Sequence, residues 1–208
     1  MGELKKGLFL AFEGIDGSGK STQIRLLEEK LGEQGVKVLS TCEPSSGPVG
    51  TMLRQILTGK MKADSRVIAA LFAADRLDHL LNEKDGIAAA LEKGITVLTD
   101  RYYFSSYAYH STDVPMEWVI AANEESAKLC RPDLTIYIDI EAETAMDRIT
   151  RNRTSRELFE KQSLLEQIRL NYFKAFERFK GQEEILLVDG NQSVEAIHEK
   201  IWEAVSRL

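Results

Sequence analysis

The stretch Leu8-Phe9-Leu10-Ala11-Phe12-Glu13-Gly14-Ile15-Asp16-Gly17-Ser18-Gly19-Lys20-Ser21-Thr22 decides the fold of this chain. Its first five residues, Leu8–Phe12, are apolar and predict a short buried strand. The second half has the spacing Gly-x-x-x-x-Gly-Lys-Ser and leads into Ser21–Leu31, where apolar residues recur at helical spacing. Glycines let backbone N–H groups approach phosphate oxygens closely, and the first turn of a helix adds further donors. The pattern therefore predicts a strand, a phosphate-binding loop and a helix.

The charged and hydroxyl side chains of this loop have distinct expected roles. Lys20 can reach the β- and γ-phosphates of a nucleoside triphosphate, and the Ser21 hydroxyl can ligate the accompanying Mg²⁺. The alternative is a glycine-rich turn that binds nothing. It is disfavoured because the spacing, the Lys-Ser-Thr ending and the strand–loop–helix setting all agree. We therefore expect a nucleoside triphosphate to be bound by Gly14, Ile15, Asp16, Gly17, Ser18, Gly19, Lys20, Ser21 and Thr22.

The rest of the chain alternates short apolar runs with longer segments of helical period. Strands are expected at 36–41, 95–99, 134–139 and 185–188, and helices at 49–57, 65–81, 142–149, 158–179 and 194–208. Strands that alternate with helices predict an α/β fold with three layers (α/β/α), in which helices cover both faces of a five-stranded parallel sheet. No internal repeat or linker interrupts the pattern, so we expect residues 1–208 to form a single domain.

One expected helix, over 65–81, carries a clear apolar pattern. Val67, Leu71, Ala74 and Leu81 lie at helical spacing, which favours a helix over this range. Either Asp64 or Ser65 can cap the start of this helix, because both have side-chain oxygens that accept from backbone N–H groups.

The composition limits the classes of function. The 208 residues carry 27 Lys and Arg against 33 Asp and Glu, a formal net charge of −6. This balance gives no broad reason to expect nucleic-acid binding, so any bound anion must meet a local group of donors. No apolar run is long enough for a membrane helix, and the first one is too short for a secretion signal. Cys42 and Cys130 lack metal-site spacing, so we expect reduced thiols. Together, these observations lead us to expect a cytoplasmic protein without nucleic-acid or membrane partners.

A second chemical signal, Asp100-Arg101, follows the strand expected at 95–99. Ligands of open α/β sheets bind at the carboxyl ends of the strands, so this pair should face the same crevice as the loop. Asp100 can hold Mg²⁺ together with Ser21, and Arg101 can fork onto a second phosphate. A structural Asp–Arg pair is the alternative. Beside a triphosphate loop, the pair favours phosphoryl transfer to an acceptor that is itself phosphorylated.

Four groups of residues, in order along residues 8–160, resemble motifs of the thymidylate kinase family. They are Phe9–Gln23 with its Glu-Gly-x-Asp-Gly sequence, Cys42-Glu43-Pro44 with Gly50, Leu71-Phe72-Ala73-Ala74-Asp75-Arg76, and Asp100-Arg101-Tyr102 with Ser105-Ser106 and Ala108-Tyr109. The phosphate loop alone is shared by many kinases, whereas the set is far more specific. The resemblance implies a P-loop kinase fold. It also implies transfer of the γ-phosphoryl group of ATP to dTMP, giving dTDP and ADP in dTTP synthesis.

The resemblance also implies which residues hold dTMP: Asp16, Phe72, Arg76, Arg101, Ser105, Ser106 and Tyr109. By analogy with the family, Phe72 would stack on thymine, Arg76 would reach its O4 and Arg101 would clamp the 5′-phosphate. Asp16 would bind the 3′-hydroxyl. The i, i+4 spacing puts Phe72 and Arg76 on one helix face, but spacing alone is as typical of a core phenylalanine and a solvated arginine. The tyrosines within 102–107 could equally form an aromatic cluster of the core.

A group of arginines, Arg148, Arg151, Arg153 and Arg156, falls where the family carries a mobile lid over the donor phosphates, around residues 148–160. Because position 17 is a glycine, the resemblance implies that the lid supplies a catalytic arginine. We expect Arg153 and Arg156 to act in catalysis beside Lys20 and Arg101, because a closing arginine stabilises the charge of phosphoryl transfer. A solvated helix face is the alternative. The resemblance further implies a homodimer, formed through helices such as 65–81.

Three departures from the family pattern are visible. Cys42 stands where many bacterial relatives have an arginine, His110 stands where a glutamine often follows Ala-Tyr, and the lid arginine comes slightly early. Two other functions stay open: a P-loop kinase of another nucleotide or of a nucleoside, and a nucleotide-binding switch that acts by changing shape. A switch would not bind dTMP in the presence of a non-hydrolysable ATP analogue.

Overall fold

The structure is a computed structural model that describes residues 7–149 and 155–208, the side chains of the second range from residue 161 onward. Its centre is a five-stranded parallel sheet in the order β2-β3-β1-β4-β5. The strands are β1 (Phe9–Glu13), β2 (Val38–Cys42), β3 (Thr96–Asp100), β4 (Leu134–Asp139) and β5 (Ile185–Asp189). The expected sheet is confirmed.

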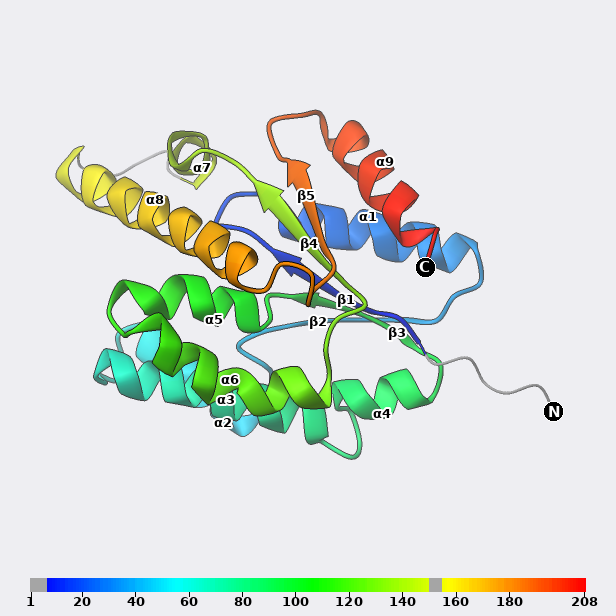
Figure 1. Ribbon diagram of the computed structural model, residues 1–208, viewed down its shortest axis with the longest axis horizontal. Helices are drawn as coiled ribbons and strands as arrows, with labels where there is room; N and C mark the ends of the chain where they lie inside the picture. The colour runs from blue at the N-terminus through cyan, green and yellow to red at the C-terminus, as the bar shows by residue number, and fades with distance from the viewer. Residues whose placement is uncertain (1–6, 150–154) are drawn as a thin grey trace.

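Helices cover both faces of this sheet, as Figure 1 shows. The helices α1 (Lys20–Glu33) and α9 (Val194–Val205) lie on one face. The other face carries α4 (Ile87–Glu92), α5 (Tyr103–Tyr109), α6 (Met116–Leu129) and α8 (Ser155–Arg178). The chain also forms α2 (Pro48–Leu57), α3 (Ser65–Leu81) and α7 (Ala142–Ile149), with a 3₁₀ turn, η1, at His110–Thr112. The three-layer prediction is therefore confirmed.

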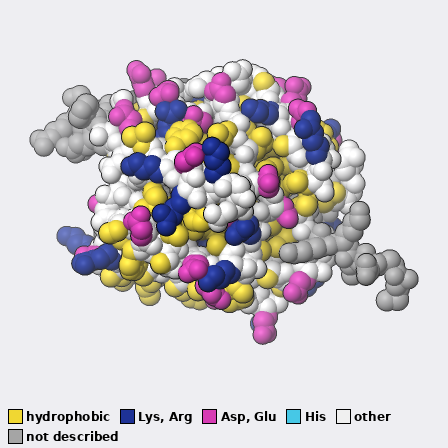
Figure 2. Space-filling view, viewed as in Figure 1, with side chains coloured by type: hydrophobic (Ala, Val, Ile, Leu, Met, Phe, Trp, Pro, Cys, Tyr) yellow, Lys and Arg dark blue, Asp and Glu magenta, His cyan; other side chains and the backbone are white. Residues whose placement is uncertain are grey.

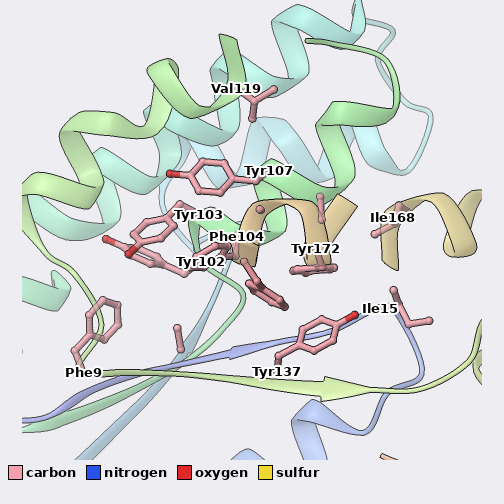
Figure 3. Close-up of a cluster of buried hydrophobic side chains, with 14 of the residues drawn as sticks. Phe9, Ile15, Tyr102, Tyr103, Phe104, Tyr107, Val119, Tyr137, Ile168 and Tyr172 are labelled. Carbon is pink, nitrogen blue, oxygen red and sulfur yellow. The ribbon is translucent and has the colours of Figure 1, made fainter. Parts of the chain in front are cut away.

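The side chains of β1 alternate between two separate cores. Leu10 and Phe12 pack with residues of α1 and α9, whereas Phe9 and Ala11 pack on the opposite side. This alternation is the two-residue period of a strand, and burial on both faces explains why the strand is apolar throughout. The core that contains Phe9 includes a cluster of aromatic rings (Figure 3), in which Phe9 and Tyr137 extend from the sheet toward Tyr102 and Tyr172.

The expected strand limits are correct for β4 and one or two residues off elsewhere. The ladders run on to Glu13, Cys42, Asp100 and Asp189, where an apolar pattern predicts an end. Polar residues can pair there because this edge of the sheet opens onto a crevice, where polar side chains are not forced into the core.

Three helices were not expected: α4, α5 and α6. The clearest case is α5, in which every residue from Tyr103 to Ala108 is buried. A helix that is buried all round has no amphipathic period, and its tyrosine, phenylalanine and serine are poor helix formers. The alternative for Tyr102, Tyr103 and Tyr107 is borne out, since all three are about 1% exposed and belong to the aromatic core.

The helix α3 has the expected limits and begins at one of the two expected caps. Asp64 is the N-cap and accepts from the backbone N–H of Arg66 at 2.9 Å. Val67 and Leu81 are 50% and 56% exposed, while the buried positions include Asp75 and Arg76. The buried side of α3 combines the apolar residues Ala69, Ala73 and Leu80 with Asp75 and Arg76, and Arg76 takes part in the site described below.

Candidate functional site

The site lies at the carboxyl edge of the sheet, around β1. The neighbours of β1 are β3 on one side and β4 on the other, so the strand order reverses there, and open α/β sheets bind ligands at such a point. Two adjoining cavities of about 400 Å³ each open at this edge. Asp16, Glu43 and Arg101 line both of them, so the two cavities share one boundary.

The loop between β1 and α1 lines one of these cavities. Gly14 has φ 142°, and a Cβ there would lie 2.7 Å from the carbonyl oxygen of Ile138, so only glycine fits. Gly19 is left-handed at φ 98°, and no side chain caps the first turn of α1. The N–H groups and the positive end of the helix dipole are therefore available to an anion in this cavity.

Lys20 lies under this loop and is 7% exposed. Its Nζ donates to the carbonyl oxygens of Gly14 and Ile15, at 3.1 and 3.3 Å, and lies 3.9 Å from a carboxylate oxygen of Asp100. Burial, reinforced by the nearby charge of Arg101, lowers the pKa of Lys20 to about 8. A phosphate in the cavity would add negative charge beside this ammonium to that of Asp100.

Ser21 and Asp100 meet at the floor of the same cavity. The Ser21 hydroxyl donates to Oδ2 of Asp100 at 3.2 Å, and Oδ1 of Asp100 is buried without a hydrogen bond in the described part of the chain. A hydroxyl beside an unsatisfied carboxylate oxygen is a donor set that suits Mg²⁺, which binds through few protein oxygens and through phosphates. Among the described residues no group of three His, Cys, Asp or Glu side chains could hold a metal alone.

Arg101 stands at the boundary of the two cavities. Its φ is 77°, the single positive value for a non-glycine residue among those described, and this turn follows the end of β3 directly. The guanidinium donates to Asp16 at 2.7 Å, to the Tyr109 hydroxyl at 2.8 Å and to the Ser105 hydroxyl at 2.9 Å. Burial alone would lower the pKa of Arg101, but Tyr109, Tyr172 and the carboxylates outweigh it and raise it. The side chain stays charged.

A buried carboxylate, Glu13, supports Arg101 from below. It is fully buried and accepts from the Tyr102 N–H at 2.9 Å, the Ser105 hydroxyl at 2.5 Å and the Tyr172 hydroxyl at 2.8 Å. Burial raises the pKa of Glu13 above its usual range, against these hydrogen bonds. Through Ser105 and Tyr172, Glu13 fixes the surroundings of the guanidinium.

Glu13 and Tyr172 were not predicted as site residues. A carboxylate at the end of an apolar strand is a usable signal for Glu13, because a charge in a buried strand needs partners. Tyr172 gives no such signal, since it reaches the site from α8, 71 positions after Arg101.

The second cavity holds the expected acceptor residues together. Asp16, Phe72, Arg76, Arg101, Ser105, Ser106 and Tyr109 all line it. An apolar wall that sequence reasoning missed completes it, with Leu57, Ile68, Leu164 and Ile168. These residues come from α2, α3 and α8, so no local pattern marks them as neighbours.

Arg76 is almost fully buried, at 1% exposure, which rules out the alternative of a solvated cation. Its Nε donates to Oε2 of Glu43 at 2.8 Å, and its Nη1 donates to the Ser106 hydroxyl at 3.1 Å and to Asn123. Phe72 lies one turn away on α3 and its ring centre is 4.7 Å from that of His110. Burial, helped by the charge of Arg76, lowers the pKa of His110 to about 4, so this imidazole is neutral at pH 7.

A third cavity, of about 320 Å³, lies beyond the loop and is lined by residues of the loop, of α7 and of the turn before α9. Arg148 donates there to the carbonyl oxygens of Gly17 and Gly190, at 3.3 and 3.0 Å. Of the expected lid residues, Arg151, Arg153 and the side chain of Arg156 lie outside the described residues, and Arg148 is described.

These features define a class of protein. A parallel sheet with this loop at its switch point is the fold of a P-loop kinase, and a second cavity with two arginines beside it is what a nucleoside monophosphate kinase requires. A family model described as thymidylate kinase matches residues 12–201, nearly the whole chain. The chain belongs to the thymidylate kinase family.

Individual relatives agree with the family model. A "Probable thymidylate kinase" of Pyrococcus abyssi is 39% identical over 203 residues, which cover 94% of each chain. A "Thymidylate kinase" of Acholeplasma laidlawii is 38% identical over 95% of this chain and 98% of its own, and one of Caldanaerobacter subterraneus is 37% identical over 96% and 95%. The resemblance deduced from the motifs is therefore confirmed.

Proposed function

We propose that this protein transfers the γ-phosphoryl group of ATP to the 5′-phosphate of dTMP, giving dTDP and ADP. The observation that carries the proposal is the boundary between the two cavities, where Arg101 pairs with Asp16 at 2.7 Å. One cavity offers a phosphate loop, and the other offers an aromatic ring and a buried arginine. Two nucleotides bound in them would meet at Arg101.

ATP occupies the loop side in this proposal. The glycine loop and the first turn of α1 bind the phosphates through N–H groups, and Lys20 turns from the loop carbonyls to the β- and γ-phosphates. The adenine ring enters the third cavity, where the flat guanidinium of Arg148 provides a surface for stacking.

The nucleotide dTMP occupies the other cavity. Its base lies against Phe72, within reach of Arg76 and Ser106, and its phosphate approaches Arg101. The Tyr109 hydroxyl accepts from Arg101 at 2.8 Å, and in this proposal the Tyr109 ring would lie beneath the sugar and exclude a 2′-hydroxyl. Asp16 is 55% exposed and can turn from Arg101 to a 3′-hydroxyl.

The chemical step is an in-line displacement that needs no general base. An oxygen of the dTMP phosphate, an anion at neutral pH, forms a bond to the γ-phosphorus while the bond from that phosphorus to the bridging oxygen breaks. The electron pair of the broken bond leaves on the β-phosphate of ADP. Lys20 and Arg101 neutralise charge on the transferred group at the boundary that the two cavities share.

Ser21 and Asp100 are the residues that would hold Mg²⁺ in this reaction. The ion, when bound, supplies positive charge beside the β- and γ-phosphates. We further propose that residues 148–160 form a lid over ATP within a single domain of residues 1–208, and that Arg153 or Arg156 provides positive charge at the transferred group.

A homodimer is part of the proposal as well. Val67 and Leu81 on α3 and Met52 on α2 are each about half exposed, and Figure 2 shows apolar side chains along the edge of the view where these helices lie. A second copy of the chain would cover this face. Light scattering of the wild type and of Val67→Glu tests this, since the variant is expected to be monomeric.

No helix within the described residues is long and apolar enough to cross a membrane.

The test of the proposed activity is the rate of ADP release with ATP, Mg²⁺ and one acceptor at a time. We expect dTMP to be preferred clearly over dUMP, dCMP, dGMP and AMP. Preference for another nucleotide would make the protein a different P-loop kinase. Absence of turnover, together with absence of dTMP binding in calorimetry with a non-hydrolysable ATP analogue, would instead favour a nucleotide-binding switch.

A further inference from the structure

A second buried histidine lies behind the acceptor cavity and does not line it. His79 is on α3, and its side chain is 9% exposed. It stands seven positions after Phe72 and three after Arg76, on the inward face of the helix that also carries Asp75. Asp75 holds the turn after Glu43 in place, because its carboxylate accepts from the N–H and hydroxyl of Ser45 at 2.7 and 2.6 Å. This face of α3 is therefore a polar support for the cavity.

His79 connects strand β2 with the carboxylate that holds Arg76. Its Nε2 lies 2.8 Å from the Thr41 hydroxyl. On the other side of the ring, Nδ1 lies 3.5 Å from Oε1 of Glu43. The second oxygen of the same carboxylate, Oε2, accepts from Nε of Arg76. Thr41, His79, Glu43 and Arg76 thus form one chain of contacts that ends at the acceptor cavity.

Two polar atoms in this series of contacts lack hydrogen-bond partners among the described residues, and a single proton placed between them would satisfy both. Nδ1 of His79 and Oε1 of Glu43 are both buried, and neither has a hydrogen-bond partner in the described part of the molecule. A proton on Nδ1 would let His79 donate to Glu43, and Nε2 would then accept from the Thr41 hydroxyl. The opposite tautomer would place a nitrogen lone pair against a buried carboxylate oxygen, leaving both without a partner.

We infer that His79 is a positioning residue for the acceptor, with its proton on Nδ1, and that it orients Glu43 and, through Glu43, the guanidinium of Arg76. This inference rests on the proposed function, because Arg76 is taken to contact the base of dTMP. Without His79, Glu43 loses the donor that fixes its free oxygen, and Arg76 loses its fixed orientation. The consequence falls on the acceptor more than on ATP, because Arg76, the side chain that Glu43 orients, lines the acceptor cavity and neither the loop cavity nor the third cavity.

The experiment compares His79→Leu with His79→Asn in the full-length protein. Leucine removes both ring nitrogens, whereas the amide of asparagine keeps an N–H donor near the position of Nδ1. We expect His79→Leu to raise KM for dTMP roughly tenfold, with KM for ATP and kcat within about threefold of wild type, as expected when one hydrogen bond to a charged group is lost. His79→Asn should restore most of the affinity for dTMP. Thr41→Val should raise the same KM by a smaller factor.

A second measurement uses only the wild-type protein, so it does not require any variant to fold. In the ¹⁵N spectrum of wild-type protein, the ring nitrogens of His79 should show the Nδ1–H form. An Nε2–H form would overturn the inference, and so would an unchanged KM for dTMP in His79→Leu, an equal loss for both substrates, or no rescue by asparagine. Failure of the proposed function is distinct, because the wild type itself would then show no preference for dTMP.

Discussion

The proposed donor side of the crevice is formed mainly by one continuous stretch, residues 16–22, whereas the proposed acceptor side collects side chains from positions between 16 and 172. On the donor side, backbone N–H groups and one lysine line the cavity. On the acceptor side, two arginines do, and each is held by a buried glutamate: Glu13 supports Arg101 through hydroxyl groups, and Glu43 pairs directly with Arg76. Backbone donors are fixed by the chain itself, but a charged side chain in a cavity needs partners that hold it.

The largest expected effect comes from removing one cation on each side. Lys20→Ala and Arg101→Leu should each lower kcat on the order of 10³-fold, because both charges act on the transferred group. Binding should separate the two sides. Calorimetry is expected to find weaker binding of an ATP analogue in Lys20→Ala with dTMP unaffected, and the reverse in Arg101→Leu. Equal losses of both ligands in either variant would contradict the division of the crevice.

The next effect concerns stability. Glu43→Leu leaves the charge of Arg76 buried without its partner, and we expect a loss of about 3–5 kcal/mol in the free energy of unfolding. Lys20→Ala is the matched change on the donor side. It should cost little, because burial already lowers the pKa of Lys20 and so opposes its charge in the free protein. Denaturant unfolding of both variants measures this, and similar losses would show that the two charges are supported alike.

A pH dependence should sharpen the contrast on the donor side. Lys20 has a pKa of about 8 in the free protein, and a bound phosphate favours its charged form. Above about pH 8, binding must therefore take up a proton, and the affinity for an ATP analogue should fall by roughly tenfold per pH unit. Lys20→Arg stays charged and should flatten this dependence. Calorimetry between pH 7 and 9.5 compares the two proteins, and parallel slopes would assign the titration to another group.

A further pH dependence is expected on the acceptor side, at His110. Its pKa is about 4 in the folded protein, below the ordinary value of 6.5, so the unfolded chain binds more protons between these values. Stability attributable to His110 is therefore complete above pH 6.5 and is lost as the pH falls toward 4, by up to about 3 kcal/mol. His110→Gln should lose less stability than wild type over this range. Identical acid unfolding curves would argue that His110 is not buried as a neutral ring.

The difference between the two sides also explains what could be predicted from the sequence. The loop residues are adjacent in the chain, so their spacing alone predicts a strand, a phosphate site and a helix. Arg76 and Phe72 show only an i, i+4 spacing that also fits ordinary core and surface positions, and they became acceptor candidates through the resemblance to a family. Only the structure shows that Arg76, on the buried side of α3, pairs with Glu43 and lines the cavity.

Other parts of the site have no signal in the sequence at all. Tyr172 and Leu164 reach the crevice from α8 because of how the helices pack over the sheet. The helix α5 was missed because it is buried all round, and it carries Ser105, Ser106 and Tyr109 toward the cavity. Such contacts depend on tertiary packing, which no local period encodes.

The central claim is that two nucleotides bind at once and meet at Arg101. A compound that joins adenosine to thymidine through five phosphates tests it most directly, because it can fill both cavities only if they adjoin as described. Calorimetry should find one molecule bound per chain, with an affinity at least roughly 100-fold above that of dTMP or of an ATP analogue, and with a marked loss in Phe72→Ala. An affinity no better than that of the ATP analogue, unchanged in Phe72→Ala, would contradict the account.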